Sequence, residues 1–317
     1  MTPPVSDHFN GKTFFSGGHV DRNWFDVLRW RLTSRGRRWP DRVALGPRPP
    51  PPAPKGDEVV ATWIGHATFL LQTTRGNFLT DPVFSERASP VAWAGPRRVH
   101  APGLALDALP KIDAVLLSHD HYDHCDLASL RHLAEAHHPL FVAPLRHRDL
   151  LVSAVAQRIV ELDWWESHTL GAEARVTLTP SRHWSNRLST PRNHRLWGGF
   201  FLHLGARGVW FAGDSGYDGK LFRQIGERCR ATDLALVPIG SYEPRWFMEP
   251  MHMNPAEAVQ THRDVGAKVS LAMHWGTFQL TDEGREEPVQ ALEQARIAAG
   301  LGAAEFRAPV PGETVIV

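Results

Sequence analysis

The chain has 317 residues, of which 42% are hydrophobic and 22% charged, with a formal net charge of +1. These values are ordinary for a globular protein, and the balanced charge gives no overall attraction for nucleic acid, so no nucleic-acid partner is expected. Two cysteines are too few for a disulfide framework, no run of about 18 apolar residues is present to span a membrane, and the first residues lack the apolar segment of a secretory signal. Together these features predict a cytoplasmic protein.

Residues 1–57 are predicted to form an N-terminal extension. The tract PRPPPPAPKG at residues 47–56 favours an extended strap, because proline-rich segments adopt polyproline II and form no packed core. Ahead of it, Trp24, Phe25, Val27, Leu28 and Trp30 predict a short amphipathic helix in an arginine-rich stretch. This helix either packs against the main domain, which we favour, or lies on the inner face of the membrane, which would make the protein peripheral to it.

Residues 58–317 are predicted to form the main domain. Short apolar runs predict strands over residues 59–64, 67–72, 78–81, 113–117, 140–142, 158–162, 174–179, 197–204, 208–212, 233–237, 268–273 and 313–317. Helices are expected over 126–136, 146–156, 255–265 and 288–299. Asp126 and Asn254 are the expected N-caps of the first and third helices, and Glu257 completes a capping box with Asn254. Strands in runs with interspersed helices predict an α/β domain whose two sheets are covered by helices.

The stretch SHDHYDHCD, residues 118–126, places several costly polar groups directly after a predicted buried strand. Neutral imidazole and ionised carboxylate are metal ligands. In an extended loop His119 and His121 face one point, and Asp123 and His124, one turn further on, face a second. The spacing H-x-H-x-D-H therefore predicts two adjacent metal ions, against the alternative of a solvated polar loop.

Similar residues recur downstream, each after a predicted strand. They are His183, Asp214 and His274. Because sites in sheet proteins gather at the carboxyl ends of strands, we expect these side chains to meet the first cluster. The recurrence argues against the polar-loop alternative.

This set of motifs resembles that of the metallo-β-lactamase superfamily. The resemblance implies an αββα sandwich with a two-metal centre, and each of its seven ligand positions is occupied here by histidine or aspartate. It implies one ion held by His119, His121 and His183, a second held by Asp123, His124 and His274, and Asp214 bridging both. Zinc is expected, with iron or manganese as alternatives.

A longer series of motifs, from TWIGHATFLLQ and FLTDPVFSERASP through TPSRHWSNR to HMNPAEAVQTHRDV and HWGTF, is similar to the N-acylphosphatidylethanolamine-hydrolysing phospholipases D. The similarity runs from about Val59 to the C-terminus. It implies hydrolysis of a phospholipid phosphodiester that releases phosphatidic acid and an N-acylethanolamine, and it places His252 beside the phosphate. Met251 and Arg182 stand where the mammalian enzymes carry glutamine, so the exact lipid is left open.

The chemistry expected of such a centre is attack by a metal-bound hydroxide, since two ions lower the pKa of water from 15.7 towards about 7. His252, Asp123 and Asp214 are the expected catalytic residues. The alternative is a lactonase or another carbonyl hydrolase of the same fold that acts on a small soluble substrate. A homodimer is left open.

Four further residues lie in or near these motifs. Asp81 either orients a ligand or caps a turn, and His66 is expected only to tie two loops together. Ser215, in Gly-Asp-Ser-Gly, is not expected to be a nucleophile, because no other member of a triad is apparent. Arg245 either binds an anion in an amphiphile pocket or belongs to a structured loop, which we favour.

Overall fold

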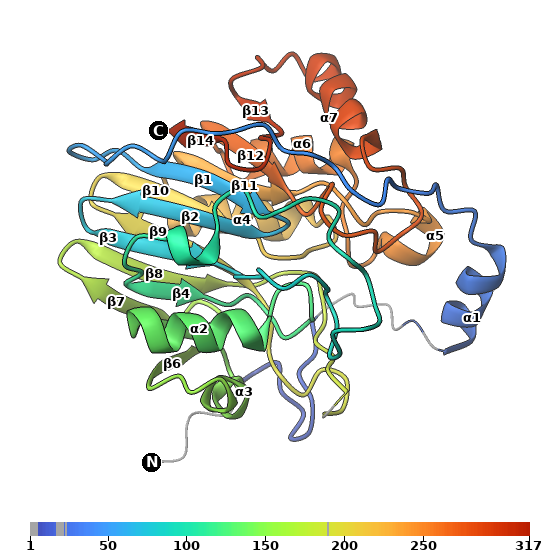
Figure 1. The fold of residues 1–317 in the computed structure, drawn as a ribbon, viewed down its shortest axis with the longest axis horizontal. Coiled ribbons are helices and arrows are strands. Elements are labelled where there is room, and N and C mark those ends of the chain that lie inside the picture. The colour runs from blue at the N-terminus through green and yellow to red at the C-terminus, as the bar shows by residue number, and fades with distance from the viewer. Residues whose placement is uncertain (1–5, 17–21, 23, 189) are drawn as a thin grey trace.

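The computed structural model describes residues 6–16, 22, 24–188 and 190–317. In it two seven-stranded sheets stack face to face, with helices on the outside (Figure 1). This is the predicted αββα sandwich, and the α/β class is confirmed. In the described part of the chain, no helix is both long enough and apolar enough to cross a membrane.

The first sheet has the strand order β14-β1-β2-β3-β4-β5-β6. Its strands are β1 (Val60–Gly65), β2 (Thr68–Thr73), β3 (Gly76–Thr80), β4 (Ala114–Leu116), β5 (Leu140–Pro144), β6 (Arg158–Leu162) and β14 (Thr314–Ile316). The pairs from β14 to β3 are antiparallel, and those from β3 to β6 are parallel. Helices α2 (Leu127–His137) and α3 (Arg148–Ser153) return the chain between the parallel strands, and a 3₁₀ turn (Leu106–Ala108) precedes β4.

The second sheet has the order β13-β12-β11-β10-β9-β8-β7. Its strands are β7 (Ser167–Gly171), β8 (Ala174–Thr179), β9 (Gly199–Leu204), β10 (Arg207–Phe211), β11 (Leu234–Pro238), β12 (Val269–Met273) and β13 (Phe306–Arg307). The pairs from β7 to β10 are antiparallel and those from β10 to β13 are parallel. Helices α4 (Gly219–Cys229), α6 (Pro255–Asp264) and α7 (Glu287–Ala298) connect the parallel strands, and α5 (Arg245–Met248) is a single turn.

Successive side chains of a strand point to opposite faces of its sheet, so one strand contributes to the apolar layers on both faces. In β2, Phe69 and Leu71 join the core between the sheets, whereas Leu70 joins the apolar cluster under α2 and α3. That second cluster includes Leu130 of α2 and Leu151 of α3, both fully buried. Both faces of the sheet are therefore covered, which is why the strands of the main domain appear as continuous apolar runs in the sequence.

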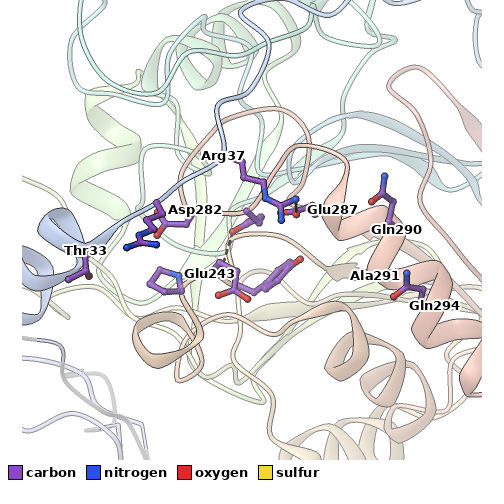
Figure 2. Close-up of a pocket in the computed structure, with 12 residues that line it drawn as sticks. Thr33, Arg37, Glu243, Asp282, Glu287, Gln290, Ala291 and Gln294 are labelled. Atoms are coloured by element: carbon purple, nitrogen blue, oxygen red, sulfur yellow. Dashed lines mark hydrogen bonds and ion pairs between the residues drawn. The ribbon is translucent and has the colours of Figure 1, made fainter.

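The N-terminal extension contains the predicted helix, α1 (Trp24–Thr33), which has no buried residue. A strap without helix or strand follows it up to β1. Asp282 anchors the junction, because its Oδ1 accepts hydrogen bonds from Trp30 Nε1 at 3.1 Å and from Ser34 Oγ at 2.7 Å. A polar pocket of about 540 Å³ lies beside this junction. Figure 2 shows the residues that line it, with Arg37 of the strap directed at Glu287 of α7, its ion-pair partner.

The predicted elements of the main domain are present, and their ends differ by a few residues at most. Asp126 caps α2 by accepting a hydrogen bond from the backbone of Ala128, and Asn254 and Glu257 form the predicted capping box of α6. The elements that the sequence analysis missed are β7, α4, α5, β13 and the 3₁₀ turn.

Candidate metal centre

All seven residues predicted to bind metal meet at one end of the sandwich, on loops that follow strands. His119, His121, Asp123 and His124 follow β4, His183 follows β8, Asp214 follows β10 and His274 follows β12. Loops from both sheets thus contribute to one site, because the carboxyl ends of these strands open on the same edge of the molecule.

The first group consists of His119, His121 and His183, whose ring nitrogens face a common point. The Nδ1 atom of His121 lies 3.0 Å from Nε2 of His119 and 3.2 Å from Nε2 of His183. One nitrogen from each ring lies within 4.8 Å of the other two, so the three can hold one ion.

The second group consists of Asp123, His124 and His274. The Oδ2 atom of Asp123 lies 3.5 Å from Nε2 of His124 and 3.3 Å from Nε2 of His274. Asp214 stands between the two groups. Its Oδ2 lies 3.2 and 3.1 Å from the same two nitrogens of the second group, and 3.9 and 3.7 Å from those of His119 and His183 in the first. This is the position a bridging carboxylate requires.

The charge states of the cluster fit a divalent cation. Burial alone raises the pKa of the Asp214 carboxyl, but His124 and His274 outweigh burial and hold this pKa well below its usual range. Burial lowers the pKa of His119 and of His183 well below that of an ordinary histidine. Burial lowers the pKa of His124 and of His274, but Asp214 and Asp123 outweigh burial and raise both, that of His274 to about 9. Because an ionised carboxylate and neutral imidazoles are the forms that bind metal, a cation would take the place of the protons on these two rings.

Buried polar atoms without hydrogen bonds also indicate a place for a cation. Among the described residues, Nε2 of His124, Nε2 of His274 and Oδ1 of Asp214 are buried without a hydrogen bond. Leaving such groups unpaired is costly in free energy, and a cation at the centre of the cluster would satisfy them together. The residues present therefore fit the metal that the sequence pattern implies.

Asp81 lies outside the ligand groups and orients two of their histidines through hydrogen bonds. Its Oδ2 accepts a hydrogen bond from Nδ1 of His124 at 2.6 Å, which turns the other nitrogen of that ring into the site. Its carboxylate also accepts hydrogen bonds from the backbone and the hydroxyl of Ser118, and that hydroxyl contacts Nδ1 of His119 at 2.8 Å. Of the two interpretations left open by the sequence, the structure shows the orienting one.

His252 lies beside the cluster and is not one of its seven members. Its Nδ1 is 4.0 Å from Oδ2 of Asp214, and burial lowers its pKa to about 4. The preceding residue, Met251, accepts a hydrogen bond from Nδ1 of His183 through its carbonyl at 3.0 Å. Arg245, the first residue of α5, donates to the His252 carbonyl at 3.0 Å and to Glu257 at 2.9 Å, so its side chain has the structural role that we favoured.

A cavity of about 280 Å³ opens between the cluster and α1. Its floor includes His121, Asp123, Asp214, His252 and His274. Its walls are mostly apolar and come from α1, α5 and neighbouring loops, namely Val27, Trp30, Trp184, Phe247, Met248 and Leu280. Phe247 and Met248 are neighbours of Arg245 in sequence, so the amphiphile pocket considered for that segment is present, whereas Trp184 and Leu280 were not predicted to line it.

Two nearby polar residues have structural partners instead, and a nearby cysteine is buried. Asp120 turns away from the cluster and pairs with Arg195 at 3.1 Å. The Ser215 hydroxyl accepts a hydrogen bond from the backbone of Arg182 and donates to the carbonyl of Gly216, in agreement with the view that it is no nucleophile. Cys125 is a buried free thiol whose pKa is raised to about 12 by burial.

Comparisons with known proteins agree with this geometry. The family profile described as "Beta-lactamase superfamily domain" matches residues 76–275. The chain is 37% identical over 244 residues to N-acyl-phosphatidylethanolamine-hydrolyzing phospholipase D 1 of Caenorhabditis elegans, covering 74% of this chain and 68% of the relative. It is also 38% identical over 308 residues to an uncharacterized protein of Mycobacterium tuberculosis, covering 93% of this chain and 79% of that protein.

A solved structure shows the same fold. Igni18, a metallo hydrolase of Ignicoccus hospitalis, superposes with a TM-score of 0.60 at 22% identity, covering 82% of this chain and 98% of that one. The profile match and the relative of 37% identity suffice to establish the family. The chain therefore belongs to the metallo-β-lactamase superfamily, as a metal-dependent hydrolase related to the N-acylphosphatidylethanolamine-hydrolysing phospholipases D.

Proposed function

We propose that this protein is a dinuclear phosphodiesterase that cleaves N-acylphosphatidylethanolamine-like lipids in the manner of a phospholipase D. The observation that carries the proposal is the position of Asp214 between two groups of ligands, at the floor of an apolar-walled cavity. Two adjacent cations suit an in-line displacement at phosphorus, and an apolar wall suits an acyl chain. The similarity to the nematode phospholipase D supports the same substrate class.

The ligands proposed for one ion are His119, His121 and His183, and those for the other are Asp123, His124 and His274. A ring nitrogen of His66 also lies within 4.8 Å of the second set. Asp214 is proposed to be shared by both ions. Histidine with carboxylate suits zinc, and iron or manganese are alternatives. Bound there, the ions would lower the pKa of water and neutralise charge on the phosphodiester.

The side chains around the ions have separate tasks. In the proposed reaction the oxygen of water bonds to phosphorus, and the bond from phosphorus to the ethanolamine oxygen breaks. His252 faces the cavity next to Asp214, where its N–H would donate a hydrogen bond to a phosphodiester oxygen. The apolar walls around Trp30 and Phe247 would hold the lipid and exclude bulk water.

Helix α1 supports a peripheral contact with the membrane. Val27 and Trp30 line the cavity, whereas Trp24, Leu28 and Leu32 are exposed. The exposed residues recur every fourth position, so they form one stripe on the helix. Arginines on and after the helix would attract anionic lipid headgroups. The expected location is thus the cytoplasm at the inner face of the membrane, and a homodimer remains a prediction.

A lipid-class screen tests the proposal. Metal-free protein reconstituted with zinc is incubated with vesicles of N-acylphosphatidylethanolamine, phosphatidylethanolamine or phosphatidylcholine, and with soluble lactones. We expect N-acylethanolamine to be released from the first vesicle in preference to any other turnover. Rapid lactone hydrolysis without phosphodiester cleavage would favour the alternative, a carbonyl hydrolase.

A further inference from the structure

His66 is fully enclosed beside the second ligand group, although the sequence analysis expected it only to tie two loops together. It directly follows β1, and its side chain is 2% exposed. Its Nε2 lies 2.9 Å from Oδ2 of Asp123. That oxygen is also the one that faces the ring nitrogens of His124 and His274, so His66 contacts the carboxylate at its ligating atom.

The backbone and the ring of His66 are held rigidly. Its N–H donates to Oγ1 of Thr277 at 2.8 Å, and its carbonyl accepts from Nε1 of Trp63 at 2.9 Å. The same carbonyl accepts from the backbone N–H of His274 at 3.0 Å. The rings of His66 and His274 lie against each other with centroids 4.0 Å apart. The ring of His66 also meets that of His124 edge-on, with centroids 5.2 Å apart. His66 thus lies against all three residues of the second group, and it contacts Asp123 through its side chain.

These backbone contacts already hold the two loops together, so they do not explain why an imidazole side chain is buried at this position. Among the described residues, its Nδ1 has no hydrogen-bond partner, and Nε2 bonds only Asp123. Burying a polar ring costs free energy unless the ring is hydrogen-bonded, and here the single hydrogen bond goes to Asp123. A carboxylate can rotate about its Cβ–Cγ bond, so a fixed donor is needed to hold one oxygen towards the metal site.

We propose that His66 is a positioning residue for the second metal ion: its Nε2–H donates to Asp123 and fixes the orientation of that carboxylate. The proposal rests on the proposed pair of metal ions. It is specific to one half of the site, because His66 contacts no member of the first group, His119, His121 and His183, within the described hydrogen bonds. Loss of the imidazole should therefore weaken the second equivalent of metal and spare the first.

The test is a zinc titration of the metal-free full-length chain by calorimetry, with cobalt absorption as a second readout of coordination. His66→Phe keeps an aromatic ring but removes the donor, and His66→Gln keeps an N–H donor of similar reach. His100→Phe is the matched control, because His100 is also buried and bonds the same Thr277 hydroxyl without touching Asp123. Circular dichroism checks the fold of each variant.

We expect His66→Phe to bind the second equivalent 10- to 100-fold more weakly, the usual cost of losing an outer partner of a ligand, with the first equivalent unchanged. His66→Gln and His100→Phe should bind both nearly as wild type does. Should His66→Phe fail to fold, His66→Asn, whose shorter side chain cannot reach Asp123, takes its place with the same expectation.

Three results would overturn the inference. Unchanged affinity for the second equivalent in His66→Phe or His66→Asn would leave the ring without this role. If His66→Gln lost as much affinity for the second equivalent as His66→Phe does, the imidazole itself would bind the ion. If His100→Phe lost the same affinity, the effect would come from disturbing the packing around Thr277 and not from the contact between His66 and Asp123. A wild-type chain that binds fewer than two equivalents would instead contradict the metal pair on which the proposed function depends.

Discussion

At the scale of single residues, Asp214 couples the two ligand groups. Its carboxylate lies within 4 Å of ring nitrogens from both groups, and it is 2% exposed. Because an ionised carboxylate in such a place is stable only beside positive charge, its removal should disturb both groups at once.

The substitution Asp214→Asn keeps the size of the side chain and removes its charge. We expect metal content to fall below two equivalents and the affinity for the remaining metal to drop by more than about 100-fold, beyond the 10- to 100-fold cost of an outer partner. Elemental analysis after gel filtration measures this. Asp233→Asn, a buried carboxylate at the start of β11 that pairs with Lys268, is the control. If Asp214→Asn retained two equivalents of metal, Asp214 would not be a bridging ligand.

His252 has a different expected signature, since it lies next to the ligands without belonging to either group. His252→Ala should retain both metal equivalents and lower kcat by about 10²-fold or more, the range for loss of a hydrogen-bond donor to the reacting group. Steady-state kinetics and metal analysis of the same preparation separate the two roles. Loss of metal in this variant would place His252 among the ligands.

The sequence predicted the seven candidate ligands because four of them share one short motif and the others follow strands. It did not resolve the tasks of Asp81 and His66. Asp81 meets His124 across 43 residues, and His66 meets Asp123 across 57. Such partners depend on how β1, β3 and β4 are paired, and local spacing carries no information about that pairing.

At the scale of elements, α1 both lines the cavity and exposes an apolar stripe. Replacing Trp24, Leu28 and Leu32 together by serine should lower kcat/KM on lipid vesicles about tenfold or more, because burying one such side chain contributes ~1.5–3 kcal/mol. Activity on a soluble phosphodiester should not change. The control is Ile297→Ser, an exposed apolar residue of α7. Equal losses on the two substrates would exclude a membrane role for α1.

The segment of residues 6–16 docks through a pair of titrating groups. His8 lies 2.8 Å from Asp163 and stacks on Trp164 with ring centroids 4.0 Å apart. Burial lowers the pKa of His8, but its bonds to Asp163 and Asp7 outweigh burial and raise it. Burial raises the pKa of Asp163, but its bond to His8 outweighs burial and lowers it.

The signs of these shifts define a pH window. The contribution of His8 to the free energy of unfolding is complete below the pKa of His8 in the unfolded chain. It is lost as pH rises through the raised pKa of His8 in the folded protein. The contribution of Asp163 is complete above its unfolded pKa and is lost as pH falls through its lowered folded pKa. The Tm difference between wild type and His8→Phe, which keeps the stack on Trp164, should therefore peak between the two folded pKa values and shrink on either side. A difference that does not vary with pH would contradict the ion pair.

Local patterns predicted most elements because both sheets bury apolar runs. Helix α4 was missed, although Asp218 caps it and Phe222, Ile225 and Cys229 form its buried stripe, since glycines and charges interrupt that stripe. Strand β7 was missed because three of its five residues are exposed, which leaves no apolar run. Elements that owe their form to pairing at a sheet edge give a weak local signal.

At the scale of the whole molecule, the two sheets have related orders, with antiparallel strands followed by parallel ones in each. Stacking the sheets brings the ends of β4, β8, β10 and β12 to one edge, where the metal centre forms (Figure 1). The sequence motif predicted this architecture through resemblance, whereas the strand order itself needed the structure, because pairing between distant strands leaves no mark in local spacing.

In the proposed reaction, water activated at the metal centre attacks phosphorus in a lipid phosphodiester. Hydrolysis of N-acylphosphatidylethanolamine vesicles by the zinc-loaded protein in water enriched in ¹⁸O tests it most directly, with mass spectrometry of both products. We expect phosphatidic acid that carries one ¹⁸O atom from water and an unlabelled N-acylethanolamine, since the bond from phosphorus to the ethanolamine oxygen breaks. Label in the N-acylethanolamine, or no phosphatidic acid from a preparation that holds two equivalents of zinc, would contradict it.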